Sequence, residues 1–336
     1  MQILKIAAVF VGTVLGAGFA SGQELWVFFA RFGISGVWGA LLSGGLIALF
    51  GGLICYQAKN EQSFDYYTYL GSVFGKHLAG AIYFITQAFM FISFSIMIAG
   101  SCELLSSQFN IPKILGGGIT LLICYACLAN RVSGIAKLNI ILSPVMCVGI
   151  LLVSIFYSFS TEEAWSGIDK IKENYLISAC LYMSYNILSS AAVLCVTSKI
   201  AKNKKEAAIS GILGGAILTV IMLFSVIALN KAGDFVLKAE FPMLLVAQRL
   251  FNILIYIYPP LIYMAMLTTA VSSGFCACEV LQRCNLKEKT AAFFVCALAV
   301  PMSMVRFSSL IKNCYMLFGV LGILLIGGVL TKSLKK

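Results

Sequence analysis

The sequence predicts an all-α integral membrane protein whose ten transmembrane helices form two inverted five-helix repeats. The membrane class follows from composition, because 60% of the 336 residues are hydrophobic and only 11% are charged. Uncharged runs of spanning length also recur along the whole chain, which leaves no room for a large soluble catalytic module. These runs cover residues 6–23, 32–58, 78–102, 114–130, 138–161, 174–198, 207–230, 250–278, 290–305 and 313–331.

The basic residues predict how the helices are oriented. The net charge of +11 comes from 24 basic and 13 acidic residues, and the basic residues flank the apolar runs. Membrane topology therefore explains them better than nucleic-acid binding does. An even number of helices places both termini on one side, and most of the basic residues fall in the loops of that side. We expect a multi-pass protein of the cytoplasmic membrane with both termini cytoplasmic.

The ten predicted helices divide into two halves of five. The first half covers residues 1–157, an external connecting loop covers 158–173, and the second half covers 174–336. Because five is odd, the second half must enter the membrane in the opposite direction to the first. This arrangement is typical of transporters that are built from inverted repeats.

The first helix of each half carries small or polar residues near mid-membrane. Helix one contains GTVLGAGFASGQE (residues 12–24), with four glycines, and helix six contains LYMSYNILSSAAVL (residues 181–194). Glycines weaken a helix, and backbone left unpaired in lipid is costly unless a cavity, an ion or a substrate satisfies it. We therefore predict that helices one and six are discontinuous and enclose a binding site.

Glu24 is the carboxylate predicted to lie deepest in the membrane. Charge at that depth indicates a function, such as gating access together with Gln23, pairing with a substrate amine or carrying a proton. The alternative is a carboxylate that neighbouring backbone caps or that reaches outward to water. Glu103 and Glu279 lie near helix ends, where an interfacial position explains them. With one histidine and no Cys/His or Ser/His pair at a plausible depth, we expect no enzyme and no organic cofactor.

Three segments carry a resemblance to a known family. They are VLGAGFASGQE, SFDYYTYLGSVFGKHLAGAIYFI and SGIAKLNIILSPVMCVGILL. In this order, and with ten helices, the chain resembles the LeuT-fold transporters of the amino acid/polyamine/organocation (APC) superfamily, and specifically the uncharacterised YkvI-type membrane proteins. The resemblance implies that backbone N–H groups of Gly16, Ala17 and Gly18 face a substrate carboxylate. The opposite wall would comprise Ser184, Tyr185 and Asn186.

The resemblance also implies a sodium ion between helices one and eight. Its ligands would be the carbonyls of Gly12, Leu15 and Thr269 and the hydroxyls of Ser272 and Ser273. Neutral oxygens suit a hard cation, although such hydroxyls also commonly bond to their own helix backbone. Phe19 replaces the asparagine of members that bind a second sodium ion, so one ion is expected. Met146 replaces the lysine of proton-coupled members, which favours sodium.

We therefore expect a secondary active transporter of a small amino acid or a related zwitterion or amine. It would be coupled to sodium and would work by alternating access around a site between helices one and six. Two alternatives remain open. One is an amino-acid-sensing membrane receptor subunit that keeps the fold without transporting, and the other is a proton-coupled transporter that uses Glu24. The expected partners are a small-molecule substrate and the lipid bilayer, with no nucleic acid and no indicated oligomeric state.

Overall fold

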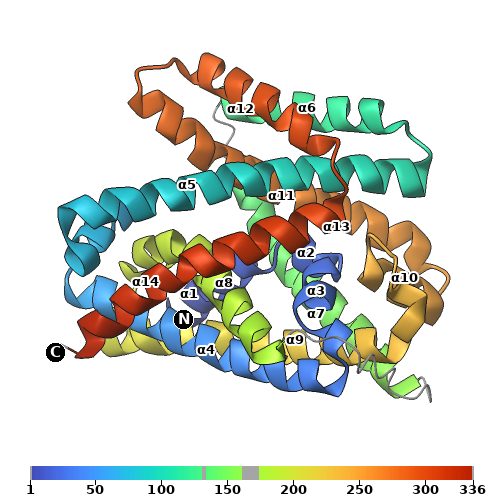
Figure 1. Cartoon of the computed structure of the whole chain (residues 1–336), viewed down its shortest axis with the longest axis horizontal. Coiled ribbons are helices and arrows are strands. Elements are labelled where there is room, and N and C mark those ends of the chain that lie inside the picture. Colours follow the sequence, from blue (N-terminus) through green and yellow to red (C-terminus); the bar gives the residue numbers. More distant parts are fainter. Residues whose placement is uncertain (1, 131–133, 161–173, 335–336) are drawn as a thin grey trace.

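The computed structural model describes residues 2–130, 134–160 and 174–334, without the side chains of 134–143 and of Asp234. All secondary structure in the described part is helical (Figure 1). The elements are α1 (Gln2–Val14), α2 (Ala17–Ala20), α3 (Gln23–Phe28), η1 (Ala30–Phe32), α4 (Ile34–Asn60), α5 (Tyr66–Phe109), α6 (Lys113–Ala129), α7 (Gly134–Ser160), α8 (Tyr175–Ser198), α9 (Lys204–Ala232), η2 (Gly233–Val236), α10 (Pro242–Leu250), α11 (Leu254–Arg283), α12 (Glu288–Ser303), α13 (Phe307–Leu310), η3 (Ile311–Tyr315) and α14 (Met316–Leu334).

Six described helical runs are long and apolar enough to cross a membrane. They are α4, α5, α8, α9, α11 and the run Phe307–Leu334 formed by α13, η3 and α14. The other expected spans correspond to the interrupted run α1–α3, to the shorter helices α6 and α12, and to α7, whose stretch with described side chains begins at Pro144. The structure thus supports a helical membrane protein, and the count of ten spans stays a prediction. The predicted connecting loop falls mainly on residues 161–173, outside the described part, so the division into repeats also stays a prediction.

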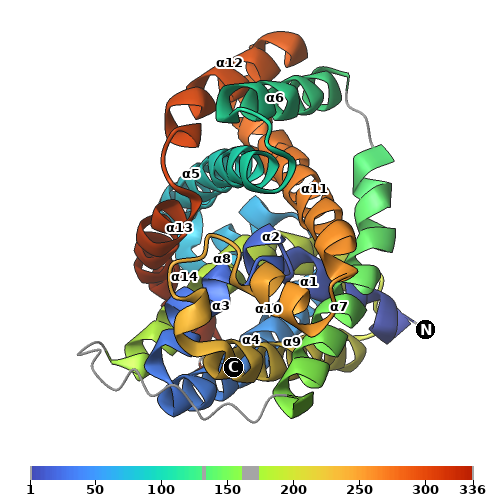
Figure 2. The same cartoon turned by 90° about the vertical axis from the view of Figure 1, so that its right-hand side faces the viewer.

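The helices pack in two groups. In the first group α4 packs along α9 and α8, and α1 lies against both α8 and α9. In the second, α5 contacts α6, α11 and α12, and α6 and α12 lie together on the outer face of α5 (Figures 1 and 2). Segment α14 packs on α8, and α7 bridges α9 and α11. The short segments α2 and α3 lie between the two groups (Figure 2).

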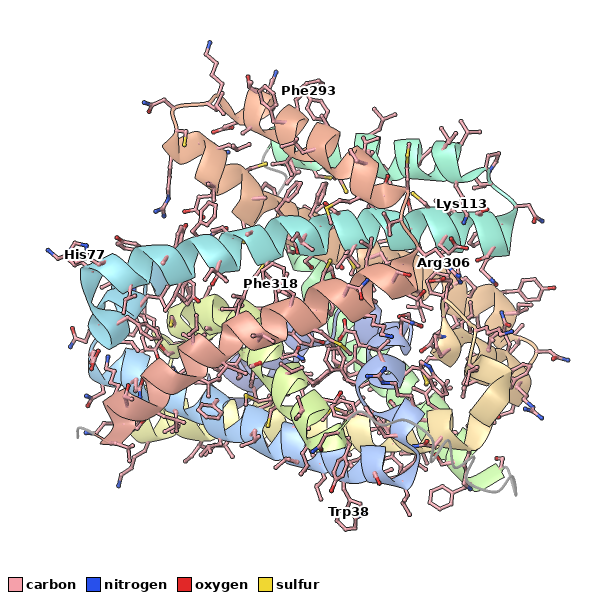
Figure 3. The ribbon with its side chains drawn as sticks, in the orientation of Figure 1. Trp38, His77, Lys113, Phe293, Arg306 and Phe318 are labelled. Atoms are coloured by element: carbon pink, nitrogen blue, oxygen red, sulfur yellow. The ribbon has the colours of Figure 1, made fainter. Side chains whose placement is uncertain are left out.

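The two ends of the bundle are defined by polar clusters. At one end Lys332 pairs with Glu61 and donates to Ser72 Oγ at 2.7 Å. At the other end Glu240 accepts from Arg306 Nε at 3.0 Å and from Ser308 Oγ at 2.9 Å. We call these ends the Lys332 side and the Glu240 side; Figure 3 shows Arg306 toward the Glu240 side and His77 at the opposite end.

The predicted interruption of the first helix is present, but the interruption predicted for helix six is absent. Helix α8 runs without a break from Tyr175 to Ser198. Its sequence contains neither Gly nor Pro, and its central polar groups bond to the helix's own carbonyls. Asn186 Nδ2 donates to Tyr182 O at 2.9 Å, and Ser190 Oγ donates to Asn186 O at 2.7 Å. Polar side chains in a membrane helix are satisfied in this way without unwinding it.

Candidate functional site

The first membrane helix is broken twice within eight residues. It ends at Val14, and Gly16 is extended (φ −82°, ψ −177°) before the short segment α2 begins at Ala17. A second break follows at Gly22, whose φ of 79° favours glycine, and α3 begins after it. Each restart leaves the first amides of the new segment, and the last carbonyls of the old one, without partners in their own helix.

Neighbouring helices satisfy several of the carbonyls that these breaks release. Tyr258 OH of α11 donates to Ala20 O at 3.0 Å, and the Met243 N–H of α10 donates to Ser21 O at 2.9 Å. Ser178 Oγ of α8 donates to Phe28 O at 2.7 Å. The broken region is therefore held in place from three directions, as backbone buried in a membrane requires.

A cavity of about 220 Å³ lies against the first break. Its walls come from α1–α3, α5, α8, α11 and η3. The lining residues are Gly12, Thr13, Val14, Gly16, Ala17, Gly18, Glu24, Phe89, Met90, Ser93, Met97, Tyr185, Asn186, Ser189, Val193, Thr269, Ser272, Ser273, Cys276 and Tyr315. The cavity thus lies between the glycine-rich break and the polar residues of α8 and α11.

Glu24 points back from α3 into this cavity. Its side chain is buried, with the residue 5% exposed, and one carboxylate oxygen accepts from Tyr185 OH at 2.6 Å. The carboxylate also lies against Gly18, because a Cβ built on Gly18 would be 2.7 Å from Glu24 Cδ. Among the described lining residues, Glu24 alone carries a formal charge. It sets the electrostatic character of the cavity.

Aromatic rings close the cavity around Glu24. The Tyr185 and Tyr315 ring centroids are 4.9 Å apart, and Phe89 lies 5.7 Å from Tyr315. Phe28 packs behind Tyr185 at 5.6 Å, and Phe318 packs edge-on against Phe89 at 4.9 Å. Such offset and edge-on pairs are favourable packing arrangements. Together they form one aromatic cluster against the part of the cavity that holds Glu24.

The cavity is accessible from the Lys332 side. Ser272 is exposed, and Thr13, Ser189 and Cys276 are half-buried, whereas the rings beside Glu24 are buried. Helices α8 and α11 both run from the Glu240 side toward the Lys332 side, so their later residues lie nearer the opening. The structure is therefore open on one side and closed on the other.

Four of the five residues predicted to bind sodium line this cavity. A Cβ built on Gly16 would lie 3.7 Å from Thr269 Oγ1, so the helix break lies against Thr269 of α11. Ser272 Oγ donates to Thr268 O at 2.8 Å, which leaves its lone pairs able to face an ion. The oxygen atoms of this region are neutral, and such oxygens are suitable ligands for sodium. Among the described residues, no group of three or more His, Cys, Asp or Glu side chains is placed to hold a metal ion.

Three predicted site residues do not line the cavity. Ser184 faces α14 instead, where its hydroxyl donates to Gly319 O. Gln23 lines a separate hollow on the Glu240 side together with Trp26 and other residues of that face. Leu15, predicted to bind sodium through its carbonyl, is a buried core residue beside the break. Each of them is adjacent in sequence to a residue that does line the cavity.

The sequence interpretation missed Phe89 of α5 and Tyr315 of η3 as lining residues. Both lie in long apolar runs, where nothing local distinguishes a cavity residue from a core residue. Ser189 could have been predicted to line the cavity, because residues 185, 186, 189 and 193 share one face of a helix and residue 184 does not. Met146 packs among apolar residues of α7 and α11, including Ile262, away from this cavity.

Sequence comparisons find relatives over the whole chain. No model of a known protein family matches it. The chain is 28% identical to membrane protein YkvI of Bacillus subtilis over 333 residues, which cover 98% of this chain and 95% of that protein. It is 27% identical to the YyaD protein of the same organism over 326 residues, covering 96% and 94% of the two chains.

Structure comparisons identify the LeuT fold. MhsT in complex with L-phenylalanine matches with a TM-score of 0.66 and 16% identity, over 96% of this chain and 80% of that one. A mutant manganese transporter of Eremococcus coleocola matches at 0.62 and 14%, over 98% and 78%. The inward-facing conformation of Mhp1 matches at 0.60 and 11%, over 95% and 73%. The predicted resemblance to LeuT-fold proteins and to YkvI is confirmed, and these structures are of transporters rather than enzymes.

Proposed function

We propose that the protein is a secondary active transporter of a small amino acid or a related zwitterion or amine. The observation that carries this proposal is the cavity at the helix break, which combines unpaired backbone groups, one carboxylate and an opening on one side only. An interrupted helix at a mid-membrane cavity is typical of transporter substrate sites. The folds of MhsT and Mhp1 support the same conclusion.

Alternating access follows from the one-sided opening. We place the protein in the cytoplasmic membrane with both termini inside, so the Lys332 side is cytoplasmic and the structure is an inward-open state. To reach the outward-open state, α3 must move away from the aromatic cluster beside Glu24 while the Lys332 side closes. The breaks at Gly16 and Gly22 provide backbone positions where α2 and α3 can turn relative to α1.

We propose sodium as the coupling ion, bound by backbone carbonyls at Gly12 and Thr269 and by the hydroxyls of Ser272 and Ser273. Coupling requires that ion and substrate bind more tightly together than apart, typically by about 1–3 kcal/mol. The ion would contact the break directly, because Thr269 lies against Gly16. A bound ion and a bound substrate would therefore stabilise the same backbone conformation.

Uptake of radiolabelled amino acids and amines into proteoliposomes tests the proposal. We expect uptake to require an inward sodium gradient and the Ser273→Ala variant to need a sodium concentration at least about tenfold higher, because one ligand is lost. Ser303→Ala is the matched control, since half-buried Ser303 lies at the end of α12 and does not line the cavity. Uptake driven equally well by a proton gradient without sodium would instead support coupling through Glu24. Binding without counterflow would support a sensing subunit.

Thiol labelling measures the side on which the cavity opens. In two variants that keep Cys276 or Cys284 as the sole cysteine, we expect Cys276 to react with a membrane-impermeant maleimide added from the cytoplasmic side, because it lines the open half of the cavity. Saturating substrate should slow this reaction. Cys284, which is exposed on the Lys332 side, is the control for sidedness and should be unaffected by substrate. Labelling of both cysteines only from outside would reverse the proposed topology.

A further inference from the structure

Glu24 can remain a charged carboxylate in this buried position only with a positive partner, and without one it takes up a proton. Its side-chain hydrogen bond comes from the neutral hydroxyl of Tyr185, which does not balance its charge. A charge in a low-dielectric interior is costly unless it is paired. The described lining residues include no Lys, Arg or His. The partner that fits this arrangement is therefore a cation that enters the cavity.

The position of Glu24 also determines which group of a ligand the break accepts. Its carboxylate lies against Gly18, with Cδ 2.7 Å and Cγ 2.9 Å from an ideal Gly18 Cβ position. The family resemblance implies a substrate carboxylate at this same backbone. Two carboxylates this close would repel each other strongly in a buried site. The break thus favours the positive end of a ligand and disfavours its acid group.

The rings beside Glu24 suit an organic cation better than a bare metal ion. Tyr185, Tyr315 and Phe89 all line the cavity, and their centroids lie between 4.9 and 6.2 Å from one another. Aromatic faces attract ammonium groups by cation–π interaction and also cover the attached alkyl carbons. The volume of about 220 Å³ corresponds to about seven waters at ~30 Å³ each, so the ligand is small.

Building on the proposed transport function, we propose that the substrate is a small organic amine whose ammonium group binds Glu24 within this ring of aromatic side chains. A carboxylate on the substrate is then dispensable. The hydroxyl groups of α8 and α11 line the other half of the cavity and remain available for the coupling ion and for water.

Matched ligands test whether the cavity binds the ammonium group or the carboxylate of an amino acid. Each amino acid is compared with the amine left by removing its carboxylate and with the acid left by removing its amino group. The three series are L-alanine, ethylamine and propionate; L-valine, isobutylamine and isovalerate; and L-phenylalanine, 2-phenylethylamine and 3-phenylpropionate. In thermal-shift titrations of the purified full chain in sodium buffer, we expect an amine to bind at least as tightly as its amino acid and the acids not to bind.

Variants then assign the ammonium contact. Glu24→Gln keeps the shape and a hydrogen-bonding group, and we expect it to weaken amine binding by about 30-fold or more, as loss of one member of a buried charge pair does. Glu103→Gln is the matched control, because Glu103 pairs with Lys113 away from the cavity. If Glu24→Gln is not folded, Tyr315→Leu replaces it, and loss of the ring should weaken amines about tenfold.

The outcomes distinguish this inference from the transport function on which it rests. If an amino acid and its deaminated acid bind while the amine does not, the inference is overturned and the transporter proposal stands. The same holds if Glu24→Gln, or Tyr315→Leu in its place, binds amines as tightly as the unmodified chain. If none of the nine compounds binds or is transported, the proposed function itself fails.

Discussion

Replacing Gly18 with alanine is expected to abolish transport while leaving the membrane fold in place. The new methyl group would lie 2.7 Å from Glu24 Cδ and 2.9 Å from Cγ, closer than carbon atoms approach without moving. The Glu24 side chain must then leave its position and lose the bond from Tyr185. Misplacement of a binding group by about 1 Å can cost about 100-fold in rate. We expect uptake to fall by at least that factor.

The control for this variant is Gly45→Ala. Gly45 lies in α4, and a Cβ there meets no atom within 4 Å, so the same chemical change should have no effect on uptake. Melting temperature and size-exclusion profile should be similar for both variants. Wild-type transport by Gly18→Ala, with an intact fold, would show that Glu24 does not need its described position.

Replacing Gly211 with valine is expected to separate α4 from α9 and to prevent stable folding. A Cβ on Gly211 would lie 2.5 Å from Gly51 C and 2.6 Å from Gly52 N. These are backbone atoms that cannot rotate away, and close helix approach in membranes depends on such small residues. Overpacking of this kind typically costs about 1–3 kcal/mol, and we expect the upper end of that range or beyond.

The matched control is Gly118→Val in α6, where a Cβ meets no atom within 4 Å. Both substitutions place a β-branched residue in a helix, so their difference isolates the contact between α4 and α9. Yield of monodisperse protein and thermal stability in detergent are the measurements. Equal stability of the two variants would mean that α4 and α9 do not approach as closely as the structure has them.

The break in the first helix was predictable because its cause is local. Four glycines in thirteen residues weaken a helix wherever they occur, and Glu24 beside them marks a place where burial requires a reason. The polar residues of α11 were placed at the same site by the family resemblance, which implies an ion near Thr269, Ser272 and Ser273. The residue types therefore indicated the break, and the resemblance indicated which segment meets it.

The continuity of α8 and the rings around Glu24 were not predictable in the same way. A serine or asparagine in a membrane helix either opens the helix or bonds to its own carbonyls, and composition does not decide between these outcomes. The position of Tyr315 depends on the packing of α14 against α8, which brings η3 to the cavity. This position depends on tertiary packing, which the composition of an apolar run does not predict.

The unbroken α8 makes two of the cavity's walls, α8 and the α1–α3 run, mechanically unequal. One wall is a single stiff rod with satisfied backbone, and the other consists of short pieces joined at two glycines. Of these two walls, a bound ligand can therefore change the conformation of the α1–α3 run only. Selectivity for molecular size would then reside in the stiff wall, around Asn186 and Ser189, whereas tolerance of different ligands would reside in the jointed one.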